Sequence, residues 1–338
     1  MGSIGQRVLY DGYLVHDVFS HILDLYYDIS LPNVHQIEGV SLLSPLASVL
    51  RKGYGNFAFK EKQVKFSSLS VQKTNNIVVC FSGGKDSVAV ALHFRSLGKN
   101  VFLYHLRGIN KSYPDEHIRA ERVAALMGLP LYVDKVQLVG KNIYKENPIK
   151  NQVVATLALN YAVQQGLGAE IAFGDFTDDS VSTGVFDRNW SDTKEMWDAF
   201  RLILEGVIPN FKIEIPFKNY LETLLLVAQN KNLLVSVQGC MAPQRFRRHW
   251  HDSNSQKYKI ELLPNRCGSC WKCCVEYIYL TDNGLLNYNQ EFYFHCLRVL
   301  KEKIPTEHPE CGGVSSYADV YKVYIPAPVP KRVYDFPF

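Results

Sequence analysis

The residue types and spacing of the segment SGGKDS (Ser82–Ser87) are suited to binding a phosphate group. Two glycines without Cβ let a phosphate approach the backbone N–H groups, and the two serine hydroxyls are further donors. A helix that starts here adds about half a positive charge, and the aspartate can bind the loop amides or a Mg²⁺. The spacing matches neither the Walker A nor the G-x-G-x-x-G pattern, and a plain strand-to-helix turn is the alternative interpretation. We predict that the phosphates of a nucleotide are bound by Ser82, Gly83, Gly84, Asp86 and Ser87.

Three cysteines, Cys267, Cys270 and Cys273, follow C-x-x-C-x-x-C spacing, and Cys240 precedes the first of them by 27 residues. A tight turn of this kind can supply three thiolates to a tetrahedral Zn²⁺, with Cys240 as the fourth ligand. An iron–sulfur cluster is the alternative, and we prefer zinc. Cys274 directly follows Cys273, and adjacent ligands strain the geometry, so we expect Cys274 to serve packing. In an intracellular chain this cluster indicates a structural metal rather than disulfides.

The segments around these groups alternate between strand and helix patterns. From residue 77 onward, short apolar runs are followed by longer segments of helical periodicity. The expected strands are Ile77–Phe81, Asn100–His105, Leu131–Val136, Glu170–Phe173 and Ile213–Ile215. The expected helices are Ser87–Leu97, His117–Met127, Lys150–Gln165, Thr193–Glu205 and Tyr220–Asn230. This alternation predicts an α/β fold, a doubly wound parallel sheet with helices on both faces.

Length and composition limit the class of protein. The chain has 338 residues, of which 47% are hydrophobic and 21% charged, so it can bury a sizeable core and is not disordered in bulk. Its net charge of +4 does not by itself indicate a nucleic-acid-binding protein. No apolar run reaches the roughly 20 residues that span a bilayer, and the start is unlike a secretory signal. We therefore expect a cytoplasmic protein without a membrane partner.

We divide the chain into four parts. Residues 1–75 are an N-terminal extension, with a helix expected at Val18–Ile29 and a hairpin within Asn56–Val71. Residues 76–238 are the α/β domain, and residues 239–280 are a loop-like zinc-binding cysteine module. Residues 281–338 are a C-terminal extension with a proline-rich end.

The segment SGGKDS after an apolar strand resembles the PP-loop of the ATP pyrophosphatases, which cleave ATP between the α- and β-phosphates and adenylate a substrate. With the cysteine spacing, the region from Ile77 to Glu276 resembles one branch, the 7-cyano-7-deazaguanine synthases (QueC). The resemblance also includes HIRAERVAALMGLPLYVDKV (His117–Val136), NPIKNQVVATLALNYAVQQG (Asn147–Gly166) and GDFTDDSVSTGVFDRNWSDTKEMWDAF (Gly174–Phe200). We interpret the chain as a divergent QueC-like protein with N- and C-terminal extensions.

This resemblance implies an adenine-nucleotide α-hydrolase-like, Rossmann-like fold and a ligase that releases AMP and pyrophosphate. Members of the family adenylate the carboxylate of 7-carboxy-7-deazaguanine, convert it with ammonia to an amide, and use a second ATP to form the nitrile. The implied cofactors are ATP, Mg²⁺ and Zn²⁺. The implied substrate residues are Asp175, Asp179, Ser180, Asp187 and Arg188, and the implied catalytic residues are Lys85, Asp86, Asp179 and Arg188.

Departures from the family pattern keep alternatives open. Glu222 stands where the family has a lysine that meets the phosphates, so Lys85 or Lys218 must supply that charge, or the chain binds nucleotide without catalysis. Basic and aromatic residues interleave in Gln244–Lys259, which favours an enzyme that modifies tRNA or a nucleobase, although a solvated basic loop fits equally. The extensions resemble those of QueC-like enzymes in anti-phage defence, which join a deazaguanine-type base to a protein partner. A homodimer is a further expectation.

Overall fold

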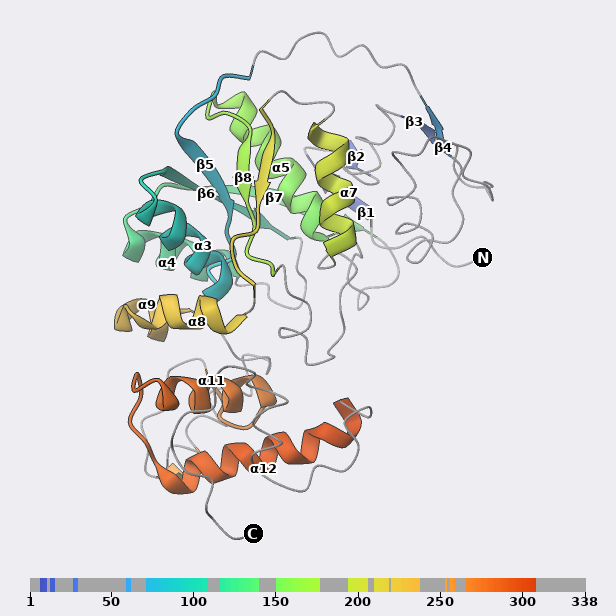
Figure 1. Ribbon diagram of the computed structural model, residues 1–338. Helices are drawn as coiled ribbons and strands as arrows, with labels where there is room; N and C mark the ends of the chain where they lie inside the picture. The colour runs from blue at the N-terminus through green and yellow to red at the C-terminus, as the bar shows by residue number, and fades with distance from the viewer. Residues whose placement is uncertain are drawn as a thin grey trace. The chain divides into compact units, whose positions relative to one another are not determined.

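The computed structural model describes residues 7–10, 13–15, 27–29, 59–61, 71–108, 116–139, 150–176, 194–205, 210–218, 220–237, 253, 256–258 and 266–307. Its strands (Figure 1) are β1 (Arg7–Tyr10), β2 (Tyr13–Val15), β3 (Tyr27–Ile29), β4 (Phe59–Glu61), β5 (Asn76–Cys80), β6 (Asn100–Arg107), β7 (Leu131–Val139), β8 (Glu170–Ala172) and β9 (Lys212–Glu214). Its helices are α3 (Lys85–Ser96), α4 (Glu116–Met127), α5 (Lys150–Gln164), α7 (Lys194–Glu205), α8 (Tyr220–Ala228), α9 (Lys231–Ser236), α11 (Trp271–Asp282) and α12 (Gln290–Glu307).

The main sheet has seven strands in the order β2-β1-β7-β6-β5-β8-β9. The five strands from β7 to β9 are parallel, while β1 is antiparallel to β7 and β2 is antiparallel to β1. The predicted α/β class with a parallel sheet is therefore confirmed. All five predicted core strands and all five predicted helices are present, with ends that differ by no more than three residues.

The strand order reverses direction beside β5. The chain moves outward from β5 through β6 to β7 and then returns to β8, on the other side of β5. Because parallel crossovers are right-handed, this reversal places the helices of the two halves on opposite faces. Figure 1 shows α4 on one side of the strands and α5 and α7 on the other. The carboxyl ends of β5 and β8 thus meet at a topological switch point, where ligands of open α/β sheets bind.

Local sequence explains the central elements. The run NIVVC of β5 is buried from Ile77 to Cys80 because a central parallel strand is covered on both faces. Helix α4 ends in a Schellman motif, in which Gly128 has φ 63° and the Leu129 N–H donates to Ala124 O over 3.2 Å. A glycine at this left-handed position avoids the strain that a Cβ would introduce.

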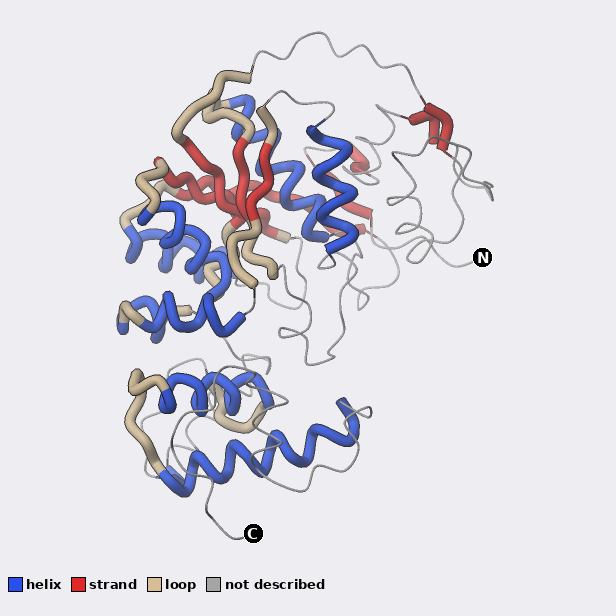
Figure 2. Tube along the Cα trace, viewed as in Figure 1, coloured by secondary structure: helices blue, strands red, loops and turns tan. Residues whose placement is uncertain are grey.

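Contacts divide the chain into two compact units. Among the described elements, the first unit contains the whole seven-stranded sheet with α4, α5, α7 and the later part of α3. The second unit contains residues Gly83–Ala89, with the start of α3, and helices α8, α9, α11 and α12. Figure 2 shows these last four elements as helices. None of the described helices combines the length and the apolar character that a membrane crossing requires.

Three expectations differ from the structure. The predicted helix Val18–Ile29 ends in a strand instead, because Tyr27–Ile29 is β3 and pairs antiparallel with β4. The cysteine module is not loop-like after Cys270, since α11 follows at once and packs against α12. Every residue of α11 from Cys273 to Thr281 is buried, and a helix that is buried all round lacks the amphipathic period by which helices are predicted.

Strands β1 and β2 of the N-terminal extension join the main sheet, which the sequence did not indicate. The four-part division itself stays a prediction.

Candidate functional site

The segment Ser82–Ser87 connects β5 to α3, at the switch point of the sheet. Gly83 has φ 69°, a left-handed conformation that favours glycine. The carbonyl of Gly84 accepts hydrogen bonds from Val88 N and Ser87 Oγ, each 3.1 Å long. Helix α3 therefore begins directly at the loop, and its first N–H groups have no intrahelical acceptor. This is the backbone geometry that anion binding at a helix N-terminus requires.

Lys85, Asp86 and Thr223 form a compact polar cluster in the second unit. The ammonium group of Lys85 donates to Asp86 Oδ1 and, over 3.2 Å, to Thr223 Oγ1. The Thr223 hydroxyl in turn donates to Asp86 Oδ1 over 2.6 Å. Lys85 is 1% exposed, and its Nζ lies 5.8 Å from the ring centroid of Phe176. The Lys85 charge is thus enclosed by a carboxylate, a hydroxyl and an aromatic face.

The ionisation of this cluster depends on its neighbours. Burial lowers the pKa of Lys85, and the Asp86 carboxylate partly opposes this shift. For Asp86, burial alone would raise the pKa, but the charges of Lys85 and Lys272 and the hydrogen bonds from Lys85 and Thr223 hold it below its ordinary value. The carboxylate is therefore ionised at neutral pH and is a suitable oxygen ligand for Mg²⁺.

The two serines of the loop are engaged in different ways. The Ser82 carbonyl accepts a 3.2 Å hydrogen bond from Arg119 Nη2, which fixes the backbone at the end of β5. Ser87 is buried, and its hydroxyl donates to Gly84 O within its own turn. Ser87 was predicted to donate to a phosphate; that role stays a prediction, as do those of Ser82, Gly83 and Gly84.

A histidine of the first unit lies at the same edge of the sheet and was not predicted. His105 is buried near the carboxyl end of β6, and its Nδ1 lies 2.8 Å from Phe81 O. A carbonyl oxygen only accepts, so Nδ1 carries the hydrogen and Nε2 is an acceptor. Burial lowers the pKa of His105 and keeps the ring neutral. Within the described residues, Nε2 has no hydrogen-bond partner. A polar residue between the apolar residues Tyr104 and Leu106 of the strand was the available signal.

Asp175 is the predicted substrate residue that the structure describes. It is buried beyond β8, and its Oδ2 accepts a 2.7 Å hydrogen bond from the indole of Trp197. The indole bond gives Asp175 a structural role in orienting α7, whatever it does with a substrate. The other predicted residues of this loop, Asp179, Ser180, Asp187 and Arg188, lie outside the described residues.

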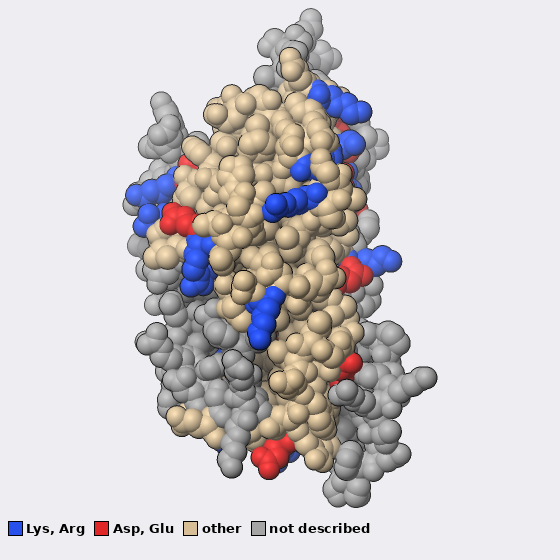
Figure 3. Space-filling view, turned by 90° about the vertical axis from the view of Figure 1, so that its left-hand side faces the viewer, with Lys and Arg blue, Asp and Glu red and all other residues tan. Residues whose placement is uncertain are grey.

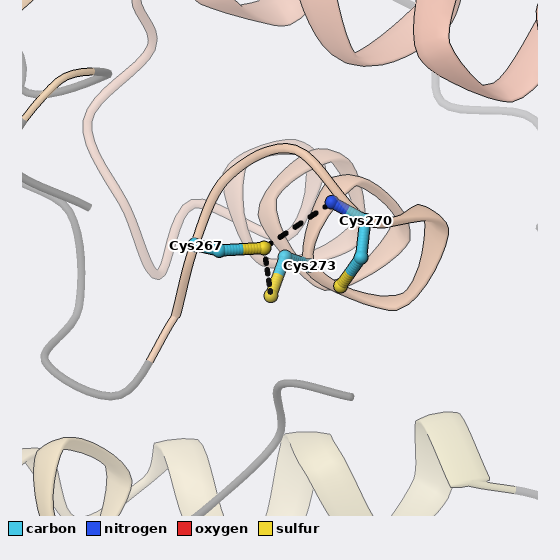
Figure 4. A group of neighbouring side chains, drawn as sticks. All are labelled: Cys267, Cys270 and Cys273. Carbon is cyan, nitrogen blue, oxygen red and sulfur yellow. Dashed lines mark hydrogen bonds between the residues drawn. The ribbon is translucent and has the colours of Figure 1, made fainter. Parts of the chain in front are cut away.

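Cys267, Cys270 and Cys273 bring their sulfur atoms together at the start of α11 (Figure 4). The three Sγ atoms lie within 4.8 Å of one another, and Cys267 and Cys273 are 3.8 Å apart. Four sulfurs bound to a tetrahedral Zn²⁺ at about 2.3 Å would be separated by about 3.8 Å. Backbone N–H groups of Ser269 and Cys270 point at Cys267 Sγ over 3.4 and 3.2 Å, which stabilises a thiolate. The donor set thus fits zinc, and the predicted fourth ligand, Cys240, lies outside the described residues.

A buried ion pair joins the residues on either side of this cysteine turn. Arg266 precedes the turn and Glu276 follows it, and Arg266 Nε donates to Glu276 Oε2 over 2.7 Å. Their side chains are 4% and 1% exposed. Arg266 Nη1 also donates to Val237 O over 2.8 Å. Cys274 is buried beside Gly268, consistent with the expected packing role, and burial raises the pKa of its thiol.

Sequence reasoning missed Thr223 and the Arg266–Glu276 pair. Thr223 is fully buried on α8, among Leu221, Leu224 and Val227. A polar residue on the buried face of so apolar a helix needs a partner, and this was the available signal. The signal does not reveal which partner. For Arg266 and Glu276, nothing in the spacing indicates burial or pairing.

Charged side chains do not gather into one patch on the face drawn in Figure 3, as far as its described residues show. Lys, Arg, Asp and Glu are interspersed there with uncharged residues.

Comparison with known proteins gives limited likeness. No protein-family model and no curated protein matches the chain. Among solved structures, a predicted tRNA methyltransferase subunit of Methanocaldococcus jannaschii is 19% identical, with a TM-score of 0.26; the match covers 43% of this chain and 69% of that one. An NMN synthetase of Francisella tularensis is 16% identical, with a TM-score of 0.25, and the match covers 56% of this chain and 90% of that one. These TM-scores are too low to support an argument about function.

Proposed function

We propose that the chain is an ATP-dependent enzyme of the PP-loop class that adenylates the carboxylate of a 7-deazaguanine and releases AMP and pyrophosphate. The supporting observation is the loop Ser82–Ser87, which places a left-handed glycine and a helix start at the switch point of a parallel sheet. A triphosphate is the ligand that such a loop suits, because backbone donors and the helix dipole both favour an anion. The QueC-like sequence segments support 7-carboxy-7-deazaguanine as the substrate and ammonia as the acceptor.

In this proposal different loop residues bind different parts of the Mg²⁺–ATP complex. The amides of Gly83 and Gly84 and the hydroxyls of Ser82 and Ser87 bind the pyrophosphate part of ATP. Asp86, which is ionised and half-buried, holds Mg²⁺ on the phosphates. Lys85 keeps Asp86 in place from its buried position. Asp179 and Arg188 orient the substrate, and Zn²⁺ on Cys240, Cys267, Cys270 and Cys273 holds the cysteine turn. Bound Mg²⁺ would neutralise charge on the leaving pyrophosphate.

The test is release of AMP and pyrophosphate from ATP with 7-carboxy-7-deazaguanine and ammonia. We expect release that depends on the deazaguanine and is lost in Asp86→Ala. The matched control is Asp198→Ala, which removes an aspartate that is 38% exposed and pairs with Arg201 in α7. The control should keep full turnover. A fully active Asp86→Ala protein would remove the assignment of this loop.

A second candidate is a QueC-like enzyme that joins the activated deazaguanine to a protein partner instead of making the nitrile. It is favoured by Glu222, which replaces the family's lysine and accepts a 2.8 Å hydrogen bond from Lys218 N at the start of α8. Glu222 thus serves its own helix terminus and brings no positive charge. Deazaguanine-dependent AMP formation without a nitrile product would favour this candidate. Turnover that depends on RNA, and on no deazaguanine, would instead favour a tRNA-modifying enzyme.

A further inference from the structure

Two successive carbonyl groups at the end of β5 are bound by side chains from neighbouring elements. The Phe81 N–H donates to Tyr104 O over 2.7 Å, as in a parallel ladder, but the Phe81 carbonyl accepts from Nδ1 of His105 on β6 over 2.8 Å. The next carbonyl, that of Ser82, accepts a 3.2 Å hydrogen bond from Nη2 of Arg119 on α4. All five residues belong to the first unit. The chain therefore leaves the sheet with two peptide groups restrained by side chains.

Both side chains that bind these carbonyls are themselves held in place. His105 is buried on an interior strand of the sheet, so its ring has little freedom to turn. Arg119 lies near the start of α4, where its Nη2 also donates to Glu116 Oε1 over 3.2 Å. The side chains of Arg119 and Glu116 are 16% and 17% exposed. Two regular elements, β6 and α4, thus position the donors.

A restrained carbonyl also restrains the rest of its peptide group. A trans peptide is planar, and its N–H points opposite to its C=O. The bond from Arg119 to the Ser82 carbonyl therefore sets the direction of the Gly83 N–H. Likewise, the bond from His105 to the Phe81 carbonyl fixes the peptide group that leads into Ser82, and so the backbone from which the Ser82 hydroxyl extends. Among the described residues, none accepts a hydrogen bond from the Gly83 N–H.

We propose that His105 and Arg119 are positioning residues of the phosphate loop, which aim the Gly83 N–H and the Ser82 hydroxyl at the phosphates of the nucleotide. This assignment rests on the proposed ATP-dependent function. Neither side chain has to touch the nucleotide, because each acts through a carbonyl of the loop entry. The restraint matters because a glycine gives the backbone unusual freedom, and a donor that is already oriented loses less entropy when it binds.

The experiment measures the dissociation constant of α,β-methylene-ATP with Mg²⁺ by titration calorimetry. Arg119→Met removes the donor to Ser82 O but keeps an unbranched side chain, and His105→Leu removes the donor to Phe81 O. Each variant should weaken binding about three- to tenfold, the effect of one net hydrogen bond. AMP lacks the β- and γ-phosphates, so it should bind the wild type and both variants alike.

Conservative variants separate positioning from packing. In His105→Asn the side-chain amide can still donate to Phe81 O, so binding should stay close to that of the wild type. Arg119→Lys should keep part of the affinity, because an ammonium group can also donate to Ser82 O. The matched control is Arg122→Met, which removes an exposed arginine from the same helix and should leave binding unchanged.

Melting temperatures show which variants fold, and if one of the two positions does not tolerate change, the variants at the other decide. Triphosphate binding that Arg119→Met and His105→Leu leave unchanged would overturn this inference alone. Equal losses for AMP and the triphosphate would do the same, as would a loss in His105→Asn as large as that in His105→Leu. Absence of wild-type binding would remove the proposed function together with the inference.

Discussion

The cysteine turn (Cys267–Cys273) and the cluster of Lys85, Asp86 and Thr223 are two polar sites of the second unit that are built in opposite ways. The cysteine turn takes its three described sulfur atoms from Cys267, Cys270 and Cys273, so one short stretch of chain supplies them. The cluster at the loop joins Asp86 to Thr223 across 137 residues. A local site can be recognised from spacing alone, whereas a site of distant parts exists only after the chain has folded.

The two sites also differ in what stabilises them. The thiolates of the cysteine turn repel one another unless a metal is bound between them. At Lys85, ammonium, carboxylate and hydroxyl bond to one another, so these opposite charges are paired without a metal. The stability of the cysteine turn should therefore depend on metal, and that of the Lys85 cluster on paired charge.

The largest effect is expected from removing metal ligands. The double variant Cys267→Ser/Cys273→Ser should lose its zinc and melt at lower temperature, since structural zinc contributes about 10–16 kcal/mol of apparent binding free energy in zinc-finger peptides. Elemental analysis should find about one zinc per chain in the wild type. Cys80→Ala, a buried thiol of β5, is the control that should keep the metal. A brown wild-type protein that contains iron would show that the turn holds an iron–sulfur cluster.

The second largest effect is expected from breaking the Arg266–Glu276 ion pair. Glu276→Ala removes the described carboxylate partner of buried Arg266 and should lower the free energy of unfolding by about 3–5 kcal/mol. Urea denaturation measures this loss. The control is Asp198→Ala, which breaks the exposed pair with Arg201 and should cost about 0–1 kcal/mol. Replacing both partners, in Arg266→Met/Glu276→Leu, should cost less than Glu276→Ala. If Glu276→Ala and Asp198→Ala lower the free energy of unfolding equally, the Arg266–Glu276 pair does not stabilise the cysteine turn.

A smaller effect is expected at Asp86. Asp86→Asn removes the partner of buried Lys85 and should cost about 1–3 kcal/mol at pH 7. The pKa of Asp86 is lowered in the folded state, so its carboxylate stabilises the fold above the ordinary pKa of about 3.9. That contribution disappears as the pH falls through the lowered pKa. Urea denaturation from pH 7 to pH 2 should thus show a weaker acid dependence in the variant. Parallel curves for the two proteins would refute the assignment.

The smallest effect is expected at Thr223. Thr223→Val keeps the shape of the side chain but removes its hydrogen bonds to Lys85 and Asp86, at a cost of about 0.5–1.5 kcal/mol. Thr281→Val in α11 is the control, because the buried hydroxyl of Thr281 reaches neither Lys85 nor Asp86. Thermal melts compare the two. If both valine variants are as stable as the wild type, the Thr223 hydroxyl does not hold the cluster together.

Much of the fold could be predicted because many helices and strands follow from patterns of adjacent residues in the sequence. The run IVVC predicts a buried strand, and Gly128 predicts the end of α4, each from adjacent residues alone. Prediction failed for α11, whose burial on all sides removes the period, and for β1, whose antiparallel pairing with β7 is not a local property. Short strands such as β3 carry too few residues to distinguish a strand from the end of a helix.

The residues of the candidate site also differ in whether local sequence could identify them. Spacing identified the loop glycines and the three cysteines, because each group lies within a few adjacent residues. Spacing could not identify Thr223 as a partner of Lys85 and Asp86, or Glu276 as the partner of Arg266. Their approach depends on how α8 and α11 pack, and this packing follows from the whole buried surface of the two helices.

The amino-acid sequence by itself determined the order of strands and helices, the glycine turn after β5 and the C-x-x-C-x-x-C cysteine spacing. Only the tertiary structure decided which buried charges meet, and therefore that Lys85 is enclosed by Asp86 and Thr223. The physical reason is that hydrophobic periodicity specifies which face of an element is buried, but not which other element covers it. A buried ammonium or carboxylate must find its partner on that covering element, however distant it is in the chain.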